Sequence, residues 1–207
     1  MTFYKATRPD GTDFYTGTID YAAAVGRELA IAHTGFDRTQ GASGYLSVAT
    51  ITTACTGMRW PCRLFEVAPI GRAYETDLSH KRAVRGVLVV RELDAHEVFG
   101  PQGQAVVAII DRASTVTVAQ ARQLAAARDA AWDAAWAAAW DAARDAAWAA
   151  AWDAARDAAW DAARDAAGDA ARTAARAAAG ELVRDLITPE QYELLVGPWY
   201  DVMGGRP

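Results

Sequence analysis

Short apolar runs separated by turn residues fill the first 112 residues, a pattern typical of a β-rich domain. Residues 62–68 alternate between two faces, as a half-buried strand does. Residues 84–93 form a longer apolar run with charged ends, typical of a central strand, and residues 21–33 carry apolar positions at helical spacing. We therefore expect an α+β domain with a small mixed or antiparallel sheet and one or two short helices. The expected strands are 3–7, 44–49, 62–68, 84–93 and 105–110.

From Arg128 to Arg176 the chain repeats every four residues: one large position (mostly Trp or Arg), usually an Asp, then two Ala. Alanine is the best helix former, so this tract predicts a long Ala-rich α-helix. Thr117 followed by Gln120 matches a capping box, in which each side chain satisfies a free backbone N–H of the other residue. An unbroken helix over 117–179 would be roughly 95 Å long at about 1.5 Å per residue.

The four-residue repeat does not match the helical period. Four residues turn a helix by about 400°, so each repeat moves the large side chain around the axis by about 40°. One straight partner helix therefore cannot cover all of the tryptophans. Gly168 and Gly180 are the points at which the helix could break.

The last residues predict a short helical cap. Thr188, Pro189 and Gln191 give a second capping box with proline at the first helical position. We expect a helix over 191–196 that ends at Gly197-Pro198. The expected organisation is an α+β domain at 1–112, the repeat helix at 113–179 and the C-terminal cap at 180–207.

Composition excludes several classes of protein. The net charge of −5 argues against a general nucleic-acid binder, which needs a basic surface. No apolar run is long enough for a membrane span, and the first residues do not resemble a signal peptide, so we expect a cytoplasmic protein. Cys55 and Cys62 are too few for a cysteine-only zinc site, and the histidines lack finger-like spacing. We expect no metal site and no cofactor.

The tryptophans of the repeat suggest a contact surface, because large exposed apolar patches usually mark interaction sites. This favours a non-enzymatic accessory protein that self-associates or docks a protein partner through the helix. A rod-like virion component is an alternative, and so is a repeat that arose by replication slippage and is merely tolerated. The candidate partner-binding residues are Trp132, Trp136, Trp140, Arg144, Trp148, Trp152, Arg156 and Trp160.

A second hypothesis concerns the first 112 residues, where Arg8, Ser47 and Glu92 (or Glu97) occur in that chain order. The order resembles the outline of ADP-ribosyltransferase-like domains, which implies a nucleotide-binding or transferase function. Arg8 would then bind a pyrophosphate, Ser47 would orient a ribose, and the glutamate would stabilise an oxocarbenium-like centre. The chain lacks the Ser-Thr-Ser and Glu-x-Glu motifs of those domains.

The charged pairs Lys81-Arg82 and Arg91-Glu92 are interpreted as a solvated loop and a solvated strand end.

Three stretches carry a further resemblance: CTGMRWPCRLFEVAPIG, KRAVRGVLVVREL and VRDLITPEQYELLVGPW. With them the chain resembles a group of proteins from actinobacteria and their phages. That group has a similar N-terminal domain, a variable Ala/Trp/Asp/Arg tract and this C-terminal segment. The resemblance implies a bacterial or phage origin, and it implies no activity, cofactor or catalytic residue.

Overall fold

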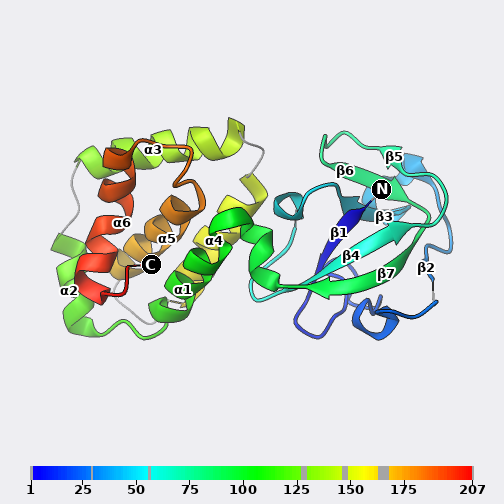
Figure 1. The fold of residues 1–207 in the computed structure, drawn as a ribbon, viewed down its shortest axis with the longest axis horizontal. Coiled ribbons are helices and arrows are strands. Elements are labelled where there is room, and N and C mark those ends of the chain that lie inside the picture. Colours follow the sequence, from blue (N-terminus) through cyan, green and yellow to red (C-terminus); the bar gives the residue numbers. More distant parts are fainter. Residues whose placement is uncertain are drawn as a thin grey trace. The chain divides into compact units, whose positions relative to one another are not determined.

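The chain forms two compact units, Met1–Val98 and Phe99–Pro207, in the computed structural model (Figure 1). The structure describes residues 2–28, 30–55, 57–126, 130–145, 149–162 and 168–206. The first unit holds a β-sheet and the second is built from helices, so the α+β class expected from the sequence is confirmed. Among the described residues, no helix is long and apolar enough to cross a membrane.

The first unit is a seven-stranded sheet with the order β2-β7-β4-β1-β3-β6-β5, in which every pair is antiparallel. Short 3-10 turns lie at Ala22–Ala24, Arg38–Ser43 and Thr52–Ala54, and a longer one at Ala95–Gln102 joins the two units. The strands are β1 (Phe3–Thr7), β2 (Ile31–Ala32), β3 (Leu46–Ala49), β4 (Arg63–Pro69), β5 (Tyr74–Glu75), β6 (Lys81–Val84) and β7 (Gly86–Leu93).

Two expectations for this part of the chain are wrong. The described residues between 21 and 33 form a three-residue 3-10 turn and the short strand β2 rather than a helix. Residues 105–110 lie in a helix, because their apolar side chains serve the core of the second unit, where Val106, Ile109 and Ile110 are buried. The expected boundary at 112 therefore lies inside the helical unit, which begins at Phe99.

The core of the first unit follows the alternation of its strands. Phe65 and Val67 on β4 are fully buried beside Phe3 on β1 and Val89 on β7. Glu66, between the two core residues on β4, points away and pairs with Arg91 at 2.7 Å. One face of the sheet therefore carries the apolar core of the unit, and Lys5, which pairs with Phe65, is on this same face.

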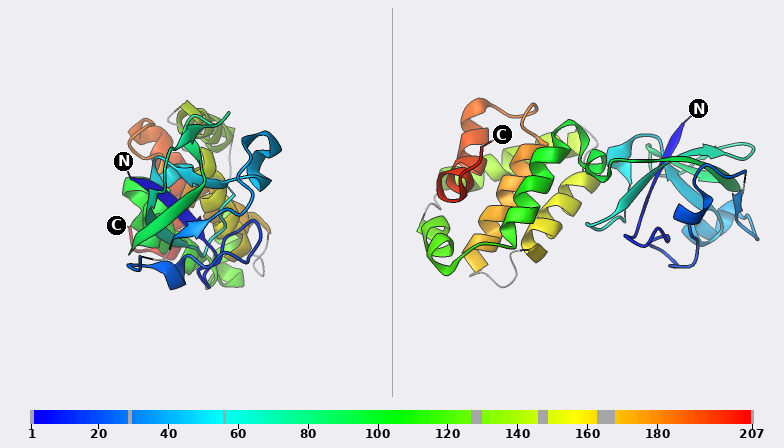
Figure 2. Two further views of the ribbon diagram at one scale, coloured as in Figure 1. Left: turned by 90° about the vertical axis from the view of Figure 1, so that its right-hand side faces the viewer. Right: turned by 60° about the horizontal axis from the view of Figure 1, so that its bottom comes forward.

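The second unit consists of helices that pack on one another. α1, α4 and α5 lie side by side, and α6 packs against α5 and α3 (Figure 2). The helices are α1 (Gly103–Ala113), α2 (Val118–Ala126), α3 (Ala130–Asp145), α4 (Ala149–Ala162), α5 (Gly168–Leu182) and α6 (Pro189–Met203). Both expected capping boxes are present, at Thr117 with Gln120 and at Thr188 with Gln191.

The repeat tract is helical, as expected, but it is not one long helix. Its described parts form α3, α4 and α5, and these three helices contact one another. Contacts between successive segments require the chain to turn back, so the expectation of a single rod is wrong. Buried alanines provide the contact faces, among them Ala135, Ala139 and Ala143 on α3.

Gly180 does not break the helix, and Gly197-Pro198 does not end the last one. Gly180 lies inside α5, where a Cβ atom would come within 3.0 Å of Leu195 and of Val196 on α6. The glycine therefore permits close packing of α5 on α6. α6 continues through Pro198 because Trp199 and Tyr200 just beyond it are buried in the same unit.

Candidate functional site

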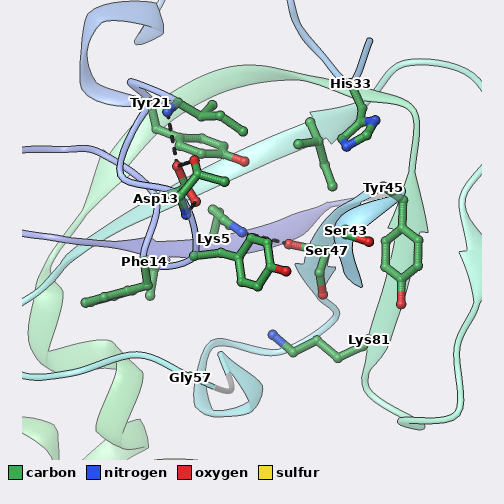
Figure 3. Close-up of a pocket in the computed structure, with 15 residues that line it drawn as sticks. Lys5, Asp13, Phe14, Tyr21, His33, Ser43, Tyr45, Ser47, Gly57 and Lys81 are labelled. Atoms are coloured by element: carbon green, nitrogen blue, oxygen red, sulfur yellow. Dashed lines mark hydrogen bonds between the residues drawn. The ribbon is translucent and has the colours of Figure 1, made fainter. Parts of the chain in front are cut away.

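A cavity opens in the first unit where two central strands separate. β1 and β3 share a single residue pair, Tyr4 with Ala49, whereas β1 pairs with β4 along its whole length. The cavity has a volume of about 330 Å³ and takes walls from both strands (Figure 3). Its lining residues are Lys5, Ala6, Asp13, Phe14, Tyr15, Thr16, Ile19, Tyr21, His33, Ser43, Tyr45, Leu46, Ser47, Gly57 and Lys81.

Two lysines line this cavity, Lys5 from β1 and Lys81 from β6 (Figure 3). They are the only lysines in the chain, in which every other basic side chain apart from histidine is an arginine. Lys81 is only 7% exposed, and Lys5 is partly exposed. The Lys5 ammonium donates a hydrogen bond to the Ser47 carbonyl oxygen at 3.1 Å. In the part of the chain that the structure describes, neither ammonium forms an ion pair with a carboxylate.

The surroundings of the lysines disfavour their charged forms. Burial, aided by the positive charge of Lys81, lowers the pKa of Lys5 from 10.5 to about 8. Burial also lowers the pKa of Lys81. The cavity thus holds two amines without an ion-pair partner, although the ionised Asp13 carboxylate also lines it, and one amine is partly neutral near pH 7.

Two further buried groups complete the wall. Tyr21 is fully buried with its ring centroid 5.5 Å from Lys5 Nζ, and burial raises the pKa of its hydroxyl. The Tyr21 hydroxyl has no hydrogen-bond partner among the described residues. Asp13 behaves differently, because its carboxylate accepts hydrogen bonds from Thr16, Thr18 and Ile19 of its own loop. The cavity therefore offers cationic and hydroxyl donors, while its one carboxylate is occupied locally.

The residues proposed for ADP-ribosyl transfer are not brought together here. Ser47 lines the cavity. Arg8 donates instead to the Phe14 carbonyl oxygen at 3.3 Å. Glu92 forms a bidentate pair with Arg63, in which both N–O distances are 2.7 Å. Glu92 is on β7, three strands away from β3, which is about 14 Å at the usual strand spacing. Glu97 does not line the cavity either.

The two lysines were not predicted from the sequence. The expectation that Lys81 lies in a solvated loop is wrong, because Lys81 begins β6 and is buried. Their rarity could have indicated both residues, since only two of the 21 Lys and Arg residues are lysines. Arg91 and Glu92 do lie at the exposed end of β7, as expected.

The tryptophans of the repeat contact one another inside the helical unit. Trp152 is fully buried, and its ring centroid lies 4.9 Å from that of Trp136 and 5.7 Å from that of Trp140. Arg176 on α5 lies over the Trp136 ring and pairs with Asp133 at 2.9 Å. These side chains thus join α3, α4 and α5 to one another.

The other candidate partner-binding residues are on the surface or outside the described part. Trp160 is 41% exposed. Arg144 and Arg156 pair with neighbouring aspartates of their own helices, at 2.8–3.1 Å. Trp148 and the side chain of Trp132 lie outside the described residues.

Within the described residues no cluster of three or more His, Cys, Asp or Glu side chains could hold a metal ion. Comparison with protein-family models, curated proteins and solved structures found no match to the chain.

Proposed function

We propose that the first unit binds a small organic anion, such as a phosphorylated metabolite or nucleotide, in the cavity between β1 and β3. The observation that carries this proposal is that both lysines of the chain line one cavity without a carboxylate partner. A cation without an ion-pair partner in a partly desolvated site favours an anionic ligand, because a charge-assisted hydrogen bond then replaces lost hydration. The cavity volume of about 330 Å³ falls at the small end of ligand pockets.

The walls favour a ligand that carries a flat ring as well as the anionic group. Tyr45 and His33 line the cavity beside Ser47 (Figure 3). Aromatic side chains provide faces or edges against which a nucleobase packs. A mononucleotide combines the ring and the phosphate, so it is the ligand class we favour.

Glycosyl transfer from such a nucleotide has less support than binding. That chemistry needs a carboxylate free to stabilise an oxocarbenium-like centre. The cavity contains no glutamate among the described residues, and the Asp13 carboxylate is held by its own loop. We therefore propose nucleotide binding without glycosyl transfer.

An accessory or virion role through self-association stays a separate hypothesis. It rests on Trp160, the most exposed described tryptophan of the repeat, because Trp152 is fully buried within its own unit.

A cytoplasmic setting is supported by Cys55 and Cys62, which are both free thiols.

Calorimetric titration of the full chain with AMP and with inorganic phosphate tests the binding proposal. We expect the wild-type chain to bind AMP more tightly than phosphate. Lys81→Met should weaken AMP binding by about tenfold to a hundredfold, because one charged hydrogen bond contributes about 1.5–3 kcal/mol. The matched control is Arg27→Met, which removes one positive charge at an exposed position. Absence of binding by the wild-type chain, or equal losses in both variants, would contradict the proposal.

A further inference from the structure

The surroundings of the Lys5 amine suit a nucleophile as well as a cation. Its amine lies in a cavity large enough for a small molecule, and Lys81 lines the same space. One hydrogen of the amine is directed to the Ser47 carbonyl oxygen at 3.1 Å. When the amine is neutral, this hydrogen bond fixes its orientation and leaves its lone pair for another atom.

The choice of lysine over arginine matters at this position. A guanidinium stays protonated in proteins and does not act as an amine nucleophile, whereas a desolvated lysine near a second cation does. This chain uses arginine at 19 positions and lysine only at the two that line the cavity. Anion binding alone would be served by arginine, so the two lysines point to amine chemistry.

We propose that Lys5 Nζ forms an imine with an anionic aldehyde or ketone bound in this cavity, with Lys81 holding the anionic group. This inference rests on the proposed function, since it uses the same site and the same anionic ligand. It adds that the ligand carries a reactive carbonyl and that binding includes a covalent step.

The step balances without a further reactant. The lone pair of neutral Lys5 Nζ attacks the carbonyl carbon, and the electron pair of the C=O bond moves to oxygen, which takes up a proton. Nζ then loses a proton, and the hydroxyl group takes up a second proton and leaves as water while the C=N bond forms. The iminium nitrogen finally loses its remaining proton, so the two protons taken up at oxygen equal the two lost from nitrogen. The overall change is amine plus carbonyl to imine plus water, with no oxidation or reduction.

Tyr21 provides the proton donor that this sequence requires. Tyr21 lines the cavity, and its buried hydroxyl has no partner among the described residues. Its ring lies next to the Lys5 amine, with 5.5 Å between Nζ and the ring centroid. A hydroxyl that stays protonated at this depth can donate to the developing alkoxide and to the leaving hydroxyl group.

The test uses pyridoxal 5′-phosphate, which combines an aldehyde, a phosphate and a flat ring. The full chain is incubated with this probe, the imine is reduced with borohydride, and the adduct is located by intact mass and peptide mapping. We expect one adduct, on Lys5, that excess AMP prevents. Pyridoxal, which lacks the phosphate, should label at least about tenfold less because it cannot pair with Lys81.

Charge-conserving variants separate the two roles. Lys5→Arg should lose the adduct because a guanidinium forms no imine, whereas Lys81→Arg should leave the adduct on Lys5 with a lower yield. An adduct on Lys81 or on the terminal amine alone would overturn the inference. AMP binding without any adduct would overturn it too and leave the anion-binding proposal intact, whereas absence of both would refute both.

A measurement on the wild-type chain avoids reliance on variants that fail to fold. The initial rate of adduct formation should rise with pH and reach half its maximum at about pH 8, near the lowered pKa of Lys5. The groups that act on Lys5 are Lys81, Cys55 and Asp13, and the Tyr21 ring adjoins it. If the rate instead keeps rising with pH well above 8, as it does for the free side-chain amine of N-acetyl-lysine amide, the proposal is overturned.

Discussion

Asp13 shows how one side chain fixes a wall of the cavity. Its carboxylate accepts hydrogen bonds from the backbone N–H groups of Thr16, Thr18 and Ile19, and from the Thr16 hydroxyl. Burial alone would raise the pKa of Asp13, but these hydrogen bonds outweigh burial and lower it from 3.8 to about 2. The ionised carboxylate therefore stabilises the loop that covers one side of the site.

Asp13→Asn is expected to lower the free energy of unfolding by about 2 kcal/mol at pH 7, the value of this pKa difference. A lowered pKa in the folded state stabilises fully above the unfolded pKa. The difference between wild type and variant should therefore be constant above about pH 5 and disappear as the pH falls from about 4 to about 2. Urea unfolding across this pH range measures it.

The control for this prediction is Asp10→Asn, since the Asp10 carboxylate is exposed and bonded only to Thr12. We expect a much smaller change for this variant. Equal losses in the two variants would show that the buried hydrogen bonds of Asp13 add nothing to stability.

Of the residues that the sequence suggested for a nucleotide site, Ser47 lines the cavity, and its role there stays a prediction. Lys5 and Lys81 were missed because they are far apart in sequence, and only the split between β1 and β3 brings them together. Pairing between strands is set by the whole sheet, so a local pattern could not have predicted that split.

The four-residue period of the repeat explains why one long helix could not keep all its large side chains on one core. Each repeat rotates the stripe of large side chains by about 40°, so four repeats turn it by about 160°. The described parts of the tract lie in α3, α4 and α5, which contact one another, so each needs only part of the stripe to face the shared core. The rotation was considered for an external partner helix, whereas the packing within the chain depends on contacts between distant segments that the repeat alone does not specify.

The packing of α5 on α6 depends on Gly180, which has no side chain. Gly180→Val should lower the free energy of unfolding by about 1–3 kcal/mol, the usual cost of overpacking a core, because the new side chain meets Leu195 and Val196. Gly168→Val is the matched control, since no atom of the described residues outside its own stretch of helix lies within 4 Å of a Cβ at that position. Thermal unfolding followed by circular dichroism compares them, and a control variant as unstable as Gly180→Val would refute the packing argument.

The two units of the molecule differ in the side chains that they carry. The sheet unit carries both lysines, and the helical unit carries a tryptophan core centred on Trp152. In the helical unit, Glu181 on α5 accepts hydrogen bonds from Tyr192 and Tyr200 on α6, both at 2.7 Å. The repeat thus provides a core for its own unit.

Trp152→Ala should therefore cost about 3–5 kcal/mol of unfolding free energy, as large-to-small changes in cores do. Trp160→Ala, which removes an exposed tryptophan from the same helix, should cost less than about 1 kcal/mol. Denaturant unfolding of the full chain measures both. Similar costs for the two variants would mean that Trp152 does not form the core of the unit.

Both lysines line one cavity, which limits the access of enzymes that modify lysine side chains. Acetylation, ubiquitin conjugation and cleavage after lysine all require a macromolecular enzyme to take a lysine side chain into its active site. Lys81 is buried and Lys5 is only partly exposed, and residues 82–207 contain no lysine. The folded chain is therefore a poor substrate for all three processes, while a small carbonyl compound can still enter the cavity.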